Sequence, residues 1–112
     1  MNGIEKIIVK RIDQLDKHGY SVKSDLKYVD GQLNSVASAL VTQNPLHWPN
    51  DWDFEIYKRW ISEPREEQLA IAGAFLAAEI DRLQYYDPSQ RNQKLFVGYR
   101  IIDHEADHET HT

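Results

Sequence analysis

The chain has 112 residues, no cysteine and a formal net charge of −5 at pH 7. The lack of cysteine excludes disulfides and thiolate metal sites, and no segment approaches the roughly 20 apolar residues that a membrane span requires, so we expect a cytoplasmic protein. Four of the 18 acidic residues lie in the last ten positions. Residues 1–102 therefore carry 13 basic and 14 acidic side chains, which is too balanced for a surface that follows nucleic-acid phosphates.

Residues 3–18 are predicted to form an amphipathic helix, with Gly19 as the residue that follows its end. Arg11 falls inside the apolar face of this helix when the residues are placed at 100° intervals. An unpaired buried charge is costly, so Arg11 needs either a carboxylate partner or an anionic ligand, and both interpretations stay open. The apolar residues of that face are Ile4, Ile8, Ile12 and Leu15.

Residues 20–30 are too short and too mixed in character for a regular element, and Ser24 and Asp25 favour a turn there. Asp30 is a suitable N-cap for a helix over residues 31–42, because its carboxylate can accept a hydrogen bond from a first-turn amide. The predicted core face of this helix consists of Leu33, Val36, Ala37, Leu40 and Val41.

Residues 43–61 contain all three tryptophans of the chain. Asn50 is a suitable cap for a short aromatic helix that places Trp52, Ile56 and Trp60 on one side. One interpretation, which we favour, is an aromatic lid over the core. The other is a stacking surface for a nucleobase, with basic side chains near its phosphate: His47, Lys58 and Arg59.

Residues 62–86 are predicted to form the central helix, with Ser62 as N-cap, Pro64 in the first turn and the Asp-Pro pair at 87–88 as its end. Gly73 costs about 1 kcal/mol relative to alanine in a helix, which indicates that another part of the protein packs closely there. The predicted core stripe consists of Leu69, Ala72, Gly73, Leu76, Ile80 and Leu83, widened by Ile71, Phe75 and Ala78.

The C-terminal part is predicted to contain an extended arm or short strand over residues 95–102, followed by a disordered acidic tail over residues 103–112. A lone strand in a helical protein lacks a partner, so we expect it to associate with another copy of the chain. The tail contains His104, His108 and His111, whose residue type suits a metal. Acidic tails with histidines are commonly solvated, so we expect no metal and no cofactor.

No nucleophile motif, phosphate-binding loop or dinucleotide motif is present. Helical nucleotide pyrophosphohydrolases hold magnesium with paired acidic motifs, and the corresponding carboxylates here would belong to Glu66, Glu67, Glu79 and Asp81. Glu66 and Glu67 are already explained by their favourable position at the start of the helix, so the enzyme would use Glu79 and Asp81. Glu79 lies at the edge of the predicted core stripe, whereas Asp81 is predicted to point away from it. We therefore assign Glu79 as the buried partner of Arg11 and keep the enzyme as an alternative.

The chain resembles, over roughly residues 4–86, a family of small phage and prophage proteins without an established activity. Their pattern runs through an ER-x-x-Q helix, a glycine before an aspartate-containing turn, G-E-L, a W-P…W segment and R-x-x-L-x-K-A-G-A-L-x-x-A-E-I-x-R-L. The matching residues are Arg11, Gln14, Gly19, Asp25, Gly31, Leu33, Trp48, Pro49, Trp52, Arg65, Leu69, 72–74 and 78–83.

Two departures from this family pattern are clear. Residues 24–28 read Ser-Asp-Leu-Lys-Tyr where the family often has a His-Asp-Asp-x-His-like turn, and Ile71 replaces the usual lysine before Ala-Gly-Ala. The resemblance implies an origin in a virus or mobile element, among small oligomeric helical proteins that act on host defence or nucleotide metabolism.

Together these features predict an all-α fold, a small helical bundle within residues 1–102 with a long central helix, that forms a homo-oligomer in a bacterial host. We expect a non-enzymatic phage-type protein that sequesters a small nucleotide-like ligand and counteracts host defence. The alternatives are the magnesium-dependent pyrophosphohydrolase and an accessory factor that binds a host protein through its tryptophan segment. The predicted ligand-binding residues are Arg11, Asp25, Trp48, Trp52, Arg59, Glu79 and Arg82.

Overall fold

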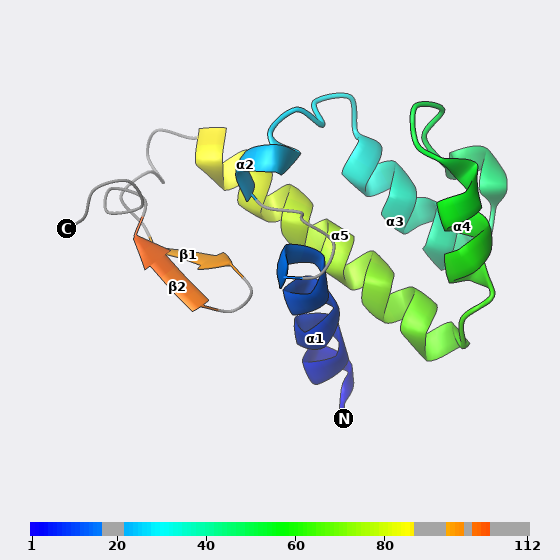
Figure 1. Ribbon diagram of the computed structural model, residues 1–112, viewed down its shortest axis with the longest axis horizontal. Coiled ribbons are helices and arrows are strands. Elements are labelled where there is room, and N and C mark those ends of the chain that lie inside the picture. Colours follow the sequence, from blue (N-terminus) through cyan, green and yellow to red (C-terminus); the bar gives the residue numbers. More distant parts are fainter. Residues whose placement is uncertain (17–21, 87–93, 98–99, 104–112) are drawn as a thin grey trace.

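The computed structural model describes residues 1–16, 22–86, 94–97 and 100–103 (Figure 1). Its elements in chain order are α1 (Gly3–Asp16), α2 (Val22–Asp25), α3 (Gln32–Thr42), the 3-10 turn η1 (Pro45–His47), α4 (Phe54–Ile61), α5 (Arg65–Tyr86), β1 (Lys94–Val97) and β2 (Arg100–Asp103).

The helices form a bundle organised around α5, the longest of them. Helices α1, α2 and α3 each contact α5, and α4 packs against α3. Figure 1 shows α1 on one side of α5 and α3 with α4 on the other. The predicted all-α bundle with a long central helix is confirmed. No helix among the described residues combines the length and the apolar composition that crossing a membrane requires.

The core lies between α3, α5 and the aromatic segment that includes α4. Aromatic rings close its outer side: Trp48 and Tyr57 are buried, and Trp52 and Trp60 pack against Phe75 of α5 with ring centroids 5.8 and 5.5 Å away. The predicted aromatic lid is therefore present. Its buried apolar neighbours are Leu33, Val36, Ala37, Ala39, Leu40, Ile71, Ala72 and Ala78.

The face of α5 that enters the core differs from the predicted one. Leu69, Leu76, Ile80 and Leu83, expected in the core stripe, are 43, 45, 55 and 53% exposed. Ala72 of the predicted stripe is buried in the core as expected, and the rest of the core face consists of the residues expected only to widen the stripe: Ile71, Phe75 and Ala78. Alanines occupy much of the remaining circumference of α5, so apolar periodicity alone did not determine which side packs against α3.

The predicted close approach at Gly73 is confirmed. A Cβ atom built on Gly73 would lie 2.7 Å from Cδ1 and 2.8 Å from Cγ1 of Ile7, so α1 occupies the space of the missing side chain. On α1 itself, Arg11 is buried, Ile8, Ile12 and Leu15 are half-buried, and Ile4 is 73% exposed. The N-terminal end of the predicted apolar face therefore lies in solvent.

Several predicted helix caps are wrong. Ser62 is the C-cap of α4, with its hydroxyl donating to the carbonyl of Lys58 at 2.6 Å. Helix α3 is preceded by Gly31 in the left-handed region, at φ 78°, with no side-chain cap from Asp30. Asp53, rather than Asn50, caps α4, because its carboxylate accepts from the amide of Glu55 at 3.0 Å.

Two further expectations about local structure change. Val22–Asp25 forms a helical turn where no regular element was expected, and Val41 of α3 is 44% exposed although it was assigned to the core face. The described residues of the predicted arm belong to two strands, and β1 pairs antiparallel with β2. That pairing supplies the strand partner within one chain, so the strand is no longer an argument for association. Gly19 and the histidines of residues 104–112 lie outside the described residues.

Gln68 of α5 joins the two ends of the aromatic segment. Its side-chain amide nitrogen donates to the backbone carbonyls of Ile61 and Glu63, each at 2.9 Å. Its side-chain oxygen accepts hydrogen bonds from Gln43 at 3.0 Å and from Arg65 at 2.9 Å. Arg65 also donates to the carbonyls of Leu40 and Val41. The C-terminal ends of α3 and α4 are thereby fixed to the first turn of α5.

Candidate functional site

A cluster of buried charged side chains lies where α1 and α2 meet α5. At its centre is Arg11, which is only 1% exposed. Its Nη1 donates to Oε1 of Gln14 at 2.9 Å, and its Nη2 donates to Oδ2 of Asp81 at 3.2 Å. Nη1 also lies 3.8 Å from Oδ2 of Asp25. Arg11 therefore has carboxylate partners on two other helices, as its burial requires.

The predicted partner of Arg11 was Glu79, and this prediction is wrong. Glu79 forms a two-bond pair with Arg82 one turn along α5, with Nε to Oε1 at 2.7 Å and Nη2 to Oε2 at 2.9 Å. Asp81 was predicted to point away from the core, yet it is 9% exposed and holds Arg11. The two acids thus serve two different arginines.

The cluster contains more carboxylates than arginines. Asp25, Glu79 and Asp81 lie beside two buried arginines, Arg11 and Arg82, and Lys27 adds a weaker attraction at Asp25. Oδ2 of Asp25 has no hydrogen-bond partner among the described residues. Burial raises the pKa of Asp25 to about 6, against the lowering effect of Arg11 and with a further rise from Asp81. Burial likewise raises the pKa of Asp81, although Arg11 opposes this rise. The cluster is therefore suited to holding a proton on Asp25 in mild acid.

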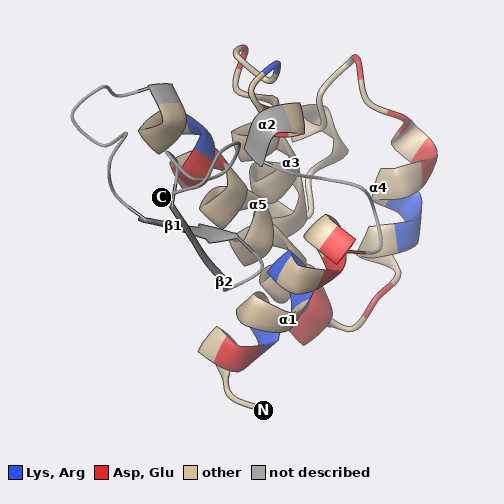
Figure 2. Ribbon diagram, turned by 60° about the vertical axis from the view of Figure 1, so that its left-hand side comes forward, with Lys and Arg blue, Asp and Glu red and all other residues tan. Residues whose placement is uncertain are grey.

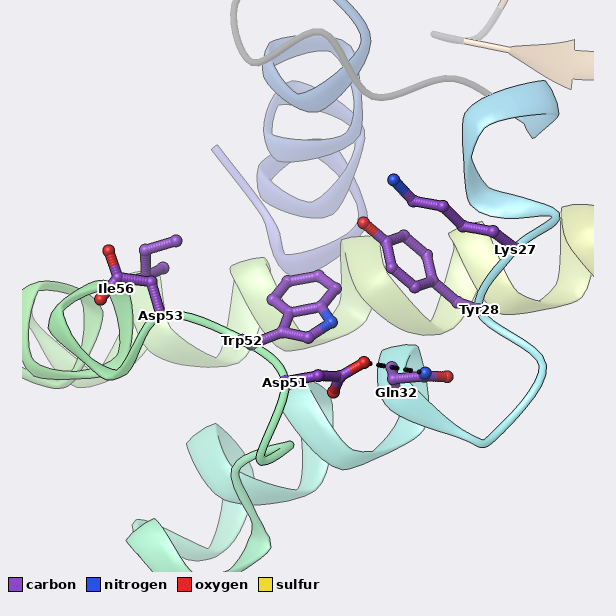
Figure 3. A pocket seen from close by; sticks show the side chains of 7 residues that line it. All are labelled: Lys27, Tyr28, Gln32, Asp51, Trp52, Asp53 and Ile56. Atoms are coloured by element: carbon purple, nitrogen blue, oxygen red, sulfur yellow. Dashed lines mark hydrogen bonds between the residues drawn. The ribbon is translucent and has the colours of Figure 1, made fainter.

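A pocket of about 420 Å³ opens beside this cluster (Figure 3). The amide of Tyr28 donates to the carbonyl of Asp25 at 3.0 Å, so a single turn connects the cluster to the pocket wall. The lining residues come from that turn, from the start of α3 and from the entry to α4: Lys27, Tyr28, Gln32, Asp51, Trp52, Asp53 and Ile56.

Two aromatic rings form the wall of this pocket. The centroids of Tyr28 and Trp52 are 5.2 Å apart, with their planes tilted by 51°, so the rings touch and form a continuous surface. Polar groups lie beside them: Nε2 of Gln32 donates to Oδ2 of Asp51 at 3.2 Å, while Oε1 of Gln32 accepts from the amide of Asp30 at 2.9 Å. Gln32 thereby fixes the position of the Asp51 carboxylate.

The seven residues predicted to bind a ligand are separated by the structure. Arg11, Asp25, Glu79 and Arg82 meet in the buried cluster, whereas Trp52 lines the pocket. Trp48 is 6% exposed, and its ring packs edge-on against Trp52 at 6.0 Å, so it is a core residue. Arg59 is exposed on α4, and no hydrogen bond or ion pair between described residues connects it to the others.

Of the seven lining residues, only Trp52 was among the predicted ligand-binding residues. The other six were missed: Lys27, Tyr28, Gln32, Asp51, Asp53 and Ile56. The only signal for Lys27, Tyr28, Asp51 and Asp53 was their position close to Asp25 or Trp52, two residues that were predicted. Within residues 1–16, 22–86, 94–97 and 100–103, no group of three or more histidine, aspartate or glutamate side chains has the arrangement to hold a metal ion.

Comparison of the chain with protein-family models, with curated proteins and with solved structures found no match.

Proposed function

We propose that the protein captures a small nucleotide-like ligand in the Tyr28–Trp52 pocket without converting it chemically. The observation that carries this proposal is a pocket of about 420 Å³ with an aromatic wall and hydrogen-bonding groups beside it. This volume lies within the roughly 300–1,000 Å³ usual for small-molecule sites. Aromatic side chains offer stacking energy to any nucleobase, because every base has a π-face.

The charges that line the pocket favour a nucleoside or a monophosphate over a triphosphate. Lys27 is the one cation among its seven lining residues, whereas Asp51 and Asp53 carry two carboxylates. A triphosphate would bring several negative charges against this excess of acid. Asp51, held by Gln32, is suited to accept a hydrogen bond from a base N–H or a sugar hydroxyl. Lys27 would then contact a single phosphate.

The pyrophosphohydrolase alternative requires Glu79 and Asp81 to hold magnesium. Both residues are buried, and the carboxylate of each is hydrogen-bonded to an arginine. A magnesium ion would have to displace those arginines and leave them buried without a partner, which is unfavourable. We therefore place capture ahead of catalysis. The resemblance to phage proteins motivates extending this proposal to ligand sequestration in a bacterial host.

The test is calorimetric titration of the full chain with nucleosides, monophosphates and triphosphates of each base, accompanied by tryptophan fluorescence. We expect saturable binding with a change in Trp52 emission, and recovery of the ligand unchanged. Lys27→Ala should weaken monophosphate binding about tenfold and leave nucleoside binding unchanged. Lys58→Ala, which removes a lysine of α4 outside the pocket, is the matched control.

Other outcomes separate the alternatives. Magnesium-dependent release of pyrophosphate would establish the enzyme instead. The capture proposal would be ruled out by two results together. The protein would bind none of these compounds at millimolar concentration, and native mass spectrometry of the purified protein would show no adduct. The search would then turn to a protein partner of the tryptophan segment, in which Leu46 and Phe54 are 88 and 44% exposed.

A further inference from the structure

Asp51 presents a carboxylate of fixed position to the Tyr28–Trp52 pocket. Its Oδ2 accepts from Nε2 of Gln32 at 3.2 Å, and Gln32 is itself held because its Oε1 accepts from the amide of Asp30 at 2.9 Å. Gln32 is only 9% exposed, so its side chain has little freedom to turn. The Asp51 side chain is therefore anchored to the start of α3.

Most of the hydrogen-bonding capacity of this carboxylate is open to a ligand. Each carboxylate oxygen can accept two hydrogen bonds. Gln32 uses one of these positions on Oδ2, and no hydrogen bond between described residues reaches Oδ1 of Asp51. The other carboxylate of the pocket, that of Asp53, already accepts from the amide of Glu55. Figure 2 shows acidic residues and no basic ones on the segment that leads into α4, so this side of the pocket is suited to hydrogen-bond donors.

The aromatic rings and the Asp51 carboxylate border the same opening, as Figure 3 shows. Asp51 directly precedes Trp52 in the chain, and the ring of Tyr28 continues the aromatic wall, with its centroid 5.2 Å from that of Trp52. A nucleobase that stacks on an aromatic side chain is told apart from other bases by the hydrogen bonds along its edge. The donors on that edge must therefore match the two acceptor oxygens of Asp51.

Guanine is the RNA base whose Watson–Crick edge carries two adjacent donors, N1–H and the N2 amino group. Adenine and cytosine have a ring-nitrogen lone pair beside their amino group, and uracil has a carbonyl oxygen on each side of its N–H. Each of these three bases would set a lone pair against the carboxylate. We propose that the pocket selects guanine nucleosides and monophosphates, with Asp51 accepting from N1–H and N2–H and Gln32 as its positioning residue. This inference rests on the proposed function and names the base that is captured.

The first test compares nucleosides, because they carry no phosphate charge. Calorimetric titration of the full chain should give guanosine at least about tenfold higher affinity than adenosine, which is the discrimination expected of one two-bond contact to a base. Inosine, which keeps N1–H but lacks the N2 amino group, should fall between them. An affinity for adenosine equal to that for guanosine would overturn the inference and leave capture standing. A chain that binds no guanine nucleoside or monophosphate would overturn it too, and capture fails with it only when the other nucleotides and the native mass spectrum are also negative.

The second test is Asp51→Asn, which replaces one acceptor by a donor. The asparagine oxygen can still accept from N1–H, but its amino group opposes the N2 amino group of guanine and matches the C2 carbonyl of xanthine. Guanosine binding should weaken at least about tenfold, and xanthosine binding should strengthen. The matched control is Asp53→Asn, in the same pocket, because asparagine is an equally good cap for α4. It should leave the ratio of guanosine to xanthosine affinity unchanged, and the same result for Asp51→Asn would overturn the role given to Asp51.

Discussion

Oδ2 of Asp81 accepts a hydrogen bond at 3.2 Å from Arg11, a residue 70 positions earlier in the chain. This contact joins the first helix to the last turns of α5, and both side chains are buried. Removing one partner of such a pair leaves an uncompensated charge inside the protein. The contact therefore has a large effect on stability that a surface ion pair lacks.

Arg11→Met should destabilise the protein by about 3–5 kcal/mol, because Asp25 and Asp81 would remain buried without their cation. Urea unfolding followed by far-UV circular dichroism measures this change. Arg59→Met removes an exposed arginine and should alter stability by no more than about 0.5 kcal/mol.

The same experiment includes a rescue. Arg11→Met combined with Asp25→Leu and Asp81→Leu leaves no unpaired charge from this contact, so most of the lost stability should return. If Arg11→Met alone costs less than about 1 kcal/mol, the pair does not have the structural role assigned to it.

The stability of the protein should depend on the protonation of Asp25. Its pKa in the folded state is about 6, compared with an ordinary value of 3.8, so the folded state keeps a proton that the unfolded chain loses as the pH rises from 4 to 6. The contribution of Asp25 to the free energy of unfolding is therefore largest below pH 4 and decreases as the pH rises to 6. Since one pKa unit corresponds to about 1.4 kcal/mol, the decrease is at most about 3 kcal/mol.

Asp25→Asn should remove this pH dependence of stability. The difference in unfolding free energy between wild type and variant separates the effect of Asp25 from that of other titrating groups. One such group is Glu67, whose pKa is lowered to about 2 by its hydrogen bonds with Lys6 and Lys10, and whose contribution is lost in acid instead. Asp30→Asn, at an exposed carboxylate, is the control. A wild-type minus Asp25→Asn difference that stays constant from pH 4 to pH 7 would contradict the prediction.

Gly73→Ala should lower stability by about 1–3 kcal/mol, although alanine is the better helix former by about 1 kcal/mol. The added Cβ would lie 2.7 Å from Cδ1 of Ile7, so α1 would have to move outward. In an Ile7→Ala background the same substitution should become stabilising. Thermal unfolding of the four proteins measures the coupling, and a stabilising Gly73→Ala in the wild-type background would show that α1 adjusts freely.

The sequence predicted the elements of the fold better than their packing. The periodicity of α1, α3 and α5 is a local property, and the need of Arg11 for a carboxylate follows from its place on an apolar face. The choice between Glu79 and Asp81 depends instead on how α1 crosses α5. That geometry is set by Ile7 against Gly73, a contact between distant parts of the chain.

The pocket was harder to predict for a related reason. Trp52 was selected because a tryptophan-rich segment must pack on something, but Gln32 and Asp51 meet only after α3 and the turn before α4 are in place. Nor could the sequence reveal the solvent-facing stripe on α5. Alanines on its other faces made the large side chains Leu69 and Leu76 look like the natural core.

Gln68 connects the two ends of the segment that carries Trp52, so it should control how that segment opens. The segment that carries Trp52 leaves α3 at Gln43 and returns at Glu63, and both ends are hydrogen-bonded to this one side chain. Exchange of amide hydrogens within the segment should therefore occur in a single cooperative opening, slower than the fraying of a free loop. Loss of that side chain in Gln68→Ala should lower the free energy of this opening, while α1 stays packed on α5.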